Sequence, residues 1–136
     1  MARILHIASN RRGEGLEIEE IGRSDSDARY AVRLKSDKYL GEGEFQTAPW
    51  LPDPVKFFDE LGAQWKGWQG EKAWQSTGST LQLTATRDGV GHICLKARIR
   101  ELVDPYSVTV PLYFDAGQLE ELSNRVRDFF TAAETA

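Results

Sequence analysis

The most regular stretch of the chain is ICLKARIR, residues 93–100. Ile93, Leu95, Ala97 and Ile99 alternate along it with smaller or cationic residues. A period of two is typical of a β-strand with one buried face and one face in water. The stretch therefore predicts a sheet that is covered on one side.

Seven other stretches are predicted to be strands, because each carries apolar residues and is bounded by residues that favour turns. They are residues 3–9, 15–23, 29–35, 39–46, 73–76, 80–86 and 106–114. Residues 87–91 predict a hairpin turn, and Asp104 and Pro105 predict the turn before the last strand. Pro111 lies inside that last strand and has no N–H to donate, which indicates an edge strand or a bulge.

Two helices are predicted, one after the fourth strand and one at the end of the chain. Asp53 followed by Pro54 is a favourable helix start, and the helix should end near Gly67. Asp115 and Gln118 have the spacing of a capping box that starts the second helix. Its apolar stripe has the spacing of a helix packed on a core, and consists of Leu119, Leu122, Val126, Phe129 and Phe130.

The element order predicts an α+β fold, with an antiparallel sheet of about seven to eight strands and two helices packed on one face. The chain has 136 residues, of which 40% are hydrophobic, and this is enough to bury one core. We expect a single α+β domain over residues 1–131, and a frayed tail over residues 132–136.

Composition disfavours several classes of protein. The net charge is −4, which is unfavourable for a nucleic-acid binder held by phosphate contacts. The absence of an apolar run long enough to span a membrane or to form a secretory signal predicts no membrane partner and a cytoplasmic location. Cys94 is the single cysteine, so no internal disulfide is possible.

No catalytic residues, metal ligands or cofactors are predicted. His92 and Cys94 share a strand face, but two ligands do not complete a metal site. No nucleophile motif such as G-x-S-x-G is present, and an enzyme would need a cleft that joins His92 or His6 to carboxylates. The glycines of Gly41-Glu42-Gly43 lack a following helix start, so we interpret them as strand or bulge glycines and not as a phosphate loop.

One candidate partner-binding surface combines tryptophan and acidic residues. Trp50 and Trp68 are candidates for exposed anchors, because tryptophan combines a large contact area with an N–H donor. Glu17 and Glu19 share a strand face, and between residues 14 and 60 acidic residues outnumber basic ones by twelve to six. Such a surface could attract a basic protein partner. The alternative is a solvated acidic face with no partner.

The alternative candidate site is a basic row. Lys96, Arg98 and Arg100 share one strand face, and with His92 they could bind a small molecule or an anion. The competing interpretation is that the row pairs across strands with Glu17 and Glu19. We favour the pairing, because it would neutralise both charged rows at once.

Several short elements in residues 57–130 resemble a family of small bacterial proteins, domain of unknown function 6228. They are Phe57-Phe58-Asp59-Glu60-Leu61, Trp65-Lys66-Gly67-Trp68, Trp74, Asp88 to Gly91-His92-Ile93, and Asp115-Ala116-Gly117-Gln118-Leu119. The resemblance implies a bacterial source and a stand-alone domain. It implies no activity and no catalytic residues.

The acidic first half and the overall layout are also loosely similar to small bacterial immunity proteins, which bind and block a toxin. The resulting expectation is a non-enzymatic protein-binding domain with a basic, toxin-like partner, present as a monomer or a homodimer. A small-molecule or anion-binding domain is the alternative.

Overall fold

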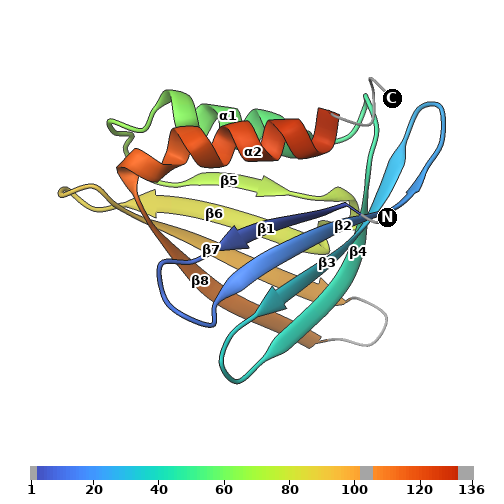
Figure 1. Ribbon diagram of the computed structural model, residues 1–136, viewed down its shortest axis with the longest axis horizontal. Coiled ribbons are helices and arrows are strands. Elements are labelled where there is room, and N and C mark those ends of the chain that lie inside the picture. Colours follow the sequence, from blue (N-terminus) through green and yellow to red (C-terminus); the bar gives the residue numbers. More distant parts are fainter. Residues whose placement is uncertain (1–2, 102–105, 132–136) are drawn as a thin grey trace.

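The computed structural model describes residues 3–101 and 106–131. Its strands form two antiparallel sheets (Figure 1). The first sheet holds β1 (Ile4–Ala8), β2 (Gly15–Arg23), β3 (Ala28–Lys35) and β4 (Leu40–Thr47), in that spatial order. The second sheet holds β5 (Lys72–Gln75), β6 (Leu81–Arg87), β7 (His92–Glu101) and β8 (Tyr106–Asp115). The predicted α+β class is confirmed.

The prediction of one continuous sheet is wrong, because the hydrogen-bonded ladder is interrupted between β4 and β5. The chain between these strands contains α1 (Pro54–Ala63), and β5 starts a separate sheet after it. The buried faces of both sheets contribute to one hydrophobic core. Alternation along a strand shows which face is buried, but it does not show whether a helix or another sheet covers that face.

The two sheets approach each other closely where β4 passes β7 and β8. A Cβ atom on Gly43 would lie only 2.7 Å from Cγ2 of Thr80 and 3.2 Å from Cγ2 of Ile99. The hydroxyl of Tyr106 donates a hydrogen bond of 2.6 Å to the carbonyl oxygen of Glu42. Glycine is thus required at position 43 because the second sheet occupies the space of a side chain.

β8 is an edge strand of the second sheet, as Pro111 predicts. Residues that follow β1 bind the outer edge of β8 near the C-terminal end of the strand. The N–H of Asn10 donates to the carbonyl oxygen of Tyr113 at 2.8 Å, and the N–H of Tyr113 donates to Oγ of Ser9 at 2.9 Å. The predicted turn at Asp104 and Pro105 and the predicted tail 132–136 lie outside the described residues.

Helix α1 starts where the sequence predicts and ends early. Oδ1 of Asp53 accepts a hydrogen bond of 2.9 Å from the N–H of Val55, so Asp53 caps the first turn. The helix ends at Ala63, before the predicted limit at Gly67. The chain leaves the helix through a turn in which the N–H of Gly67 donates to the carbonyl oxygen of Gln64 at 2.9 Å, and the guanidinium of Arg87 donates to the carbonyl oxygen of Trp65 at 3.1 Å.

Helix α2 (Leu119–Thr131) follows a short 3-10 turn (Ala116–Gln118), and the predicted capping box of Asp115 and Gln118 is present. Another 3-10 turn (Thr77–Ser79) precedes β6. The two helices lie side by side, with α1 near β5 and α2 near β1 (Figure 1). They form one layer over the core on that side of the molecule.

Candidate binding site

The predicted acidic row on the first sheet is compensated by cations of the neighbouring strand. Arg33 donates hydrogen bonds of 3.1 Å to both Glu17 and Glu19, and Nζ of Lys35 lies 2.7 Å from Glu17. The hydrogen bond from Lys35, followed by that from Arg33, holds the pKa of Glu17 below its ordinary value even though burial raises it. The row therefore presents much less negative charge than its sequence indicates.

The interpretation that Glu17 and Glu19 pair with Lys96, Arg98 and Arg100 is wrong. The partners of the two glutamates lie on β3, where Arg33 stands directly opposite Glu17 in the antiparallel register. The basic row belongs to β7 in the other sheet. Because neighbouring strands present side chains to the same face, Arg33 reaches the carboxylates before any residue of a second sheet can.

The basic row faces outward along the centre of the second sheet. Lys96 and Arg98 are exposed, and Arg100 is half-buried, with Nε donating to the carbonyl oxygen of Ser79 at 3.2 Å. Within the described ranges, no carboxylate forms an ion pair with these three residues. The row thus keeps its positive charge on the surface.

His92 shares the outward face of β7, but its ring already has a partner. Nδ1 of His92 lies 2.8 Å from Oδ2 of Asp88 in the preceding hairpin turn. Oδ1 of Asp88 accepts the backbone N–H groups of His92 and Val90, and these bonds lower the pKa of Asp88 to about 2. The histidine predicted as a ligand for anions therefore stabilises the hairpin.

The four tryptophans occupy different environments. Trp65, Trp68 and Trp74 are partly buried against the core, and the indole N–H groups of Trp68 and Trp74 are buried without a partner among the described residues. The guanidinium of Arg87 lies 5.9 Å from the ring centre of Trp68. Trp50 is different, since 69% of its surface is exposed. The sequence predicts that both Trp50 and Trp68 are candidates for exposed anchors, but in the structure Trp50 is far more exposed than Trp68.

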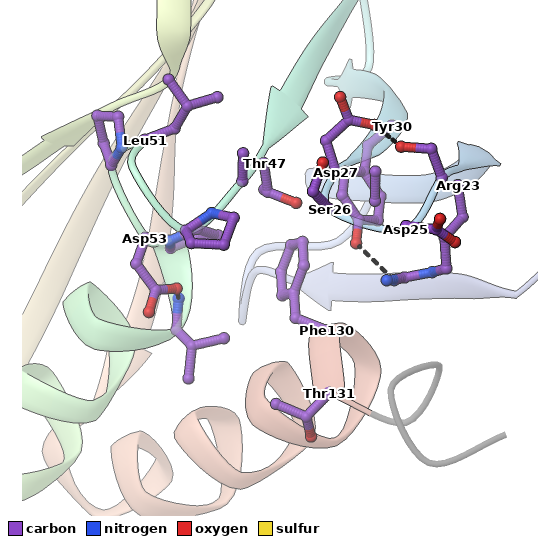
Figure 2. A pocket seen from close by; sticks show the side chains of 17 residues that line it. Arg23, Asp25, Ser26, Asp27, Tyr30, Thr47, Leu51, Asp53, Phe130 and Thr131 are labelled. Carbon is purple, nitrogen blue, oxygen red and sulfur yellow. Dashed lines mark hydrogen bonds between the residues drawn. The ribbon is translucent and has the colours of Figure 1, made fainter.

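A cavity of about 750 Å³ lies beside the connection that carries Trp50. Three segments form it: the β2–β3 hairpin turn, the proline-rich connection between β4 and α1, and the end of α2 (Figure 2). Pro49 and Leu51, the two neighbours of Trp50 in the chain, both line it. Trp50 itself is not among the lining residues, so the cavity and the exposed indole belong to the same connection but are separate features.

Carboxylates outnumber cations on the walls, and we call the opening the acidic cavity. Asp25, Asp27, Asp53 and Arg23 are its charged lining residues. Asp27 accepts hydrogen bonds from Ser24 at 2.5 Å and from Gln46 at 2.8 Å, which fixes the hairpin turn. Arg23 is held by Glu20 at 2.7 Å, so much of its charge is already balanced.

Two aromatic residues of the core also line the acidic cavity. Tyr30 is 1% exposed, and its ring centre lies 5.0 Å from that of Phe130 in an edge-on contact. Burial raises the pKa of the Tyr30 hydroxyl, which accepts a hydrogen bond of 3.4 Å from Arg23. The cavity thus combines a neutral aromatic region with an acidic one.

Sequence reasoning missed this cavity because its walls come from distant segments. The cluster Ser24-Asp25-Ser26-Asp27 reads only as a turn, and Tyr30 reads as a core residue by alternation. The useful signal was the group of Pro49, Pro52 and Pro54 around Trp50, since prolines keep a connection away from regular structure. A large apolar residue in such a connection is a candidate for exposure.

Metal-ligating side chains do not gather into a site in the part of the chain that the structure describes. In residues 3–101 and 106–131, no three His, Cys, Asp or Glu side chains lie close enough together to hold a metal ion. Burial raises the pKa of the Cys94 thiol, which keeps it protonated. Among the described helices, none has the length and apolar character needed to cross a membrane.

Comparisons with known proteins give one family and one distant structure. The family model described as "Family of unknown function (DUF6228)" matches residues 7–133, which extends the resemblance seen in residues 57–130. No curated protein matches the chain. A solved structure of Trypanosoma bruciei MRP1/MRP2 shares 12% identity, covering 97% of this chain and 87% of the other, with a TM-score of 0.43. At that TM-score, the similarity does not establish a shared fold.

Proposed function

The chain belongs to DUF6228, a family of unknown function, and from this premise we propose that it is a non-enzymatic protein-binding domain. An immunity or antitoxin role, in which the domain covers a basic toxin-like partner, is the concrete form of the proposal. One observation carries it: Trp50 is 69% exposed, in the connection whose residues Pro49 and Leu51 line the acidic cavity.

The exposure of Trp50 supports a binding role because such a residue is costly to leave in water. A tryptophan side chain buries a large apolar area when a partner covers it, and tryptophan is enriched among the residues that dominate binding energy. The neighbouring prolines limit the conformations of the connection that carries it. The backbone that carries the indole would therefore lose little conformational freedom when a partner covers it.

The charge of the cavity supports a basic partner. Asp25 is exposed in the β2–β3 turn, and Asp53 lines the opposite wall. A lysine or arginine side chain that enters between them could place its charge near the carboxylates and its methylene groups against Tyr30 and Phe130.

The other residues of the predicted partner surface contribute less in this proposal. The carboxylates of Glu17 and Glu19 are engaged by Arg33 and Lys35, so a partner would have to displace those cations. Trp68 offers only part of its ring, because its N–H is buried. We therefore place the centre of the partner surface at Trp50.

The test compares Trp50→Ala with Tyr39→Ala as a matched control. Tyr39 is also an exposed aromatic residue, at 65%, and lies in the β3–β4 turn. Tagged proteins would capture partners from lysate of the source cells, and calorimetry would give the affinity for the purified partner. We expect Trp50→Ala to weaken binding by tenfold or more, on the order of a hot-spot residue, and Tyr39→Ala to leave it unchanged.

Charge-reversal variants test whether binding depends on the carboxylates of the acidic cavity or only on the overall negative charge of the protein. Asp25→Lys should slow association with the partner, whereas Glu121→Lys on the exposed surface of α2 should have a smaller effect. Capture of no protein, or equal affinity in Trp50→Ala and Tyr39→Ala, would contradict the proposal.

A further inference from the structure

We propose that the outward face of the second sheet binds an acidic protein segment in an extended conformation. The proposal concerns the row of Lys96, Arg98 and Arg100, which we call the cationic row. This surface lies on β7 and does not include Trp50 or the acidic cavity. It is therefore independent of the partner proposed above.

The geometry of β7 sets the spacing of the cationic row. The residues between its members, Ala97 and Ile99, are buried in the core, so the three cations point to the opposite face. Side chains two residues apart on a strand are separated by roughly 6.5–7 Å along it. The row is thus a straight series of evenly spaced positive charges.

The neighbouring strands leave these charges without compensation. Lys96 stands between Thr84 and Pro111 in the sheet register, and Arg98 stands between Gln82 and Thr109. These four flanking residues are uncharged, in contrast to the glutamates that flank Arg33 in the first sheet. A carboxylate from another molecule would supply the charge that the neighbours of the row lack.

An extended acidic segment matches this surface better than a small anion does. A strand carries every second side chain on one face, so alternating carboxylates repeat at the same spacing as the cationic row. The acidic cavity and a second cavity, of about 240 Å³ near His6, include no member of the row. A small anion would thus meet a sheet face, while a segment could contact all three cations together.

An acidic protein is also favoured over single-stranded nucleic acid. Nucleic acids without a paired strand gain much of their affinity from bases stacked on aromatic side chains. Tyr113 lies on the outward side of β8, but the guanidinium of Arg11 covers its ring at 4.1 Å from the ring centre.

The experiment measures fluorescence anisotropy of a labelled peptide of about twelve residues in which Glu alternates with Thr. A second peptide has the same composition, with all Glu residues in one block. We expect the alternating peptide to bind at about 50 mM NaCl and the block peptide to bind more weakly under the same conditions. Binding should weaken about tenfold in the double variant Lys96→Gln, Arg98→Gln.

The matched control is the double variant Arg29→Gln, Lys38→Gln, which removes two exposed cations from other surfaces. It should bind the alternating peptide as the unmodified protein does, and thermal unfolding should show that both variants are folded. Absence of binding, equal weakening in the control, or equal affinity for the block peptide would overturn the proposal. Tighter binding of a labelled oligo(dT) of about twelve nucleotides, lost in Lys96→Gln, Arg98→Gln, would overturn it in favour of nucleic acid.

Discussion

The outward faces of the two sheets both carry basic side chains, but the neighbours of these side chains differ in charge. On the first sheet, Arg33 stands opposite Glu17 and binds both Glu17 and Glu19. On the second sheet, Arg98 stands between Gln82 and Thr109 and keeps its charge. The comparison shows that the charge available on a strand depends on its cross-strand neighbours, and not only on its own residues.

The largest expected effect comes from disturbing the close contact between the two sheets at Gly43. Gly43→Ala places a Cβ atom 2.7 Å from Cγ2 of Thr80, so the sheets must separate locally. We expect a loss of about 1–3 kcal/mol in the free energy of unfolding, measured with urea. Gly89→Ala, in a turn with open space around it, should change this free energy by less than about 0.5 kcal/mol. Equal losses would show that the contact is not tight.

A smaller effect on stability is expected when an arginine is removed from the outward face of either sheet, and the effect should differ between the two sheets. Arg33→Met removes the cation shared by Glu17 and Glu19, and should lower the free energy of unfolding by about 1 kcal/mol. Arg98→Met should lower it by less than about 0.5 kcal/mol. The loss for Arg33→Met should shrink in about 1 M NaCl, because salt screens partly exposed charges. A similar loss of unfolding free energy in both variants would contradict the difference in pairing between the two sheets.

The pH dependence of the first face should follow Glu17. The pKa of this carboxyl lies below its ordinary value of 4.5, so its pairing stabilises the fold above that pH. This stabilisation is lost as the pH falls through the lowered pKa. Lys35→Met should raise the pKa of Glu17 toward 4.5, measured from its carboxyl carbon by NMR, and Lys96→Met should leave it unchanged.

The smallest effect concerns the hairpin next to the cationic row. The hydrogen bonds from His92 and Val90 hold the pKa of Asp88 near 2, so the carboxylate should stabilise the turn above about pH 4 and lose this effect as the pH falls through about 2. Asp88→Asn should speed amide exchange at Val90 and His92 with little change in the unfolding midpoint. Unchanged exchange would show that the turn does not depend on this carboxylate.

Most of the fold could be predicted from local patterns. The strand at residues 15–23 has the bounds expected from the sequence, and Asp53 caps the first helix as expected, whereas the capping box of Asp115 starts a 3-10 turn that precedes α2. The division into two sheets could not be predicted, because periodicity carries no information about pairing across α1. Gly43 was identified as a strand glycine, but its reason, the proximity of Thr80, exists only in three dimensions.

The candidate surfaces were predicted in part. The cationic row and the face shared by Glu17 and Glu19 follow from alternation, since both require only that the strands form. Their partners depend on strand order, and this placed Arg33 beside the glutamates. The acidic cavity is formed by three segments that meet only after folding, so the sequence could not predict that Tyr30 and Phe130 line it.

The outer edge of β8 has a consequence for the behaviour of the protein at high concentration. A free edge strand offers unpaired N–H and carbonyl groups to a second molecule, and this is a common route to aggregation. Here Pro111 has no N–H to offer, and Ser9 and Asn10 already bind both backbone groups of Tyr113. The chain thus carries its own protection against intermolecular strand addition, and a shortened chain without Ser9 and Asn10 would expose an edge prone to polymerise.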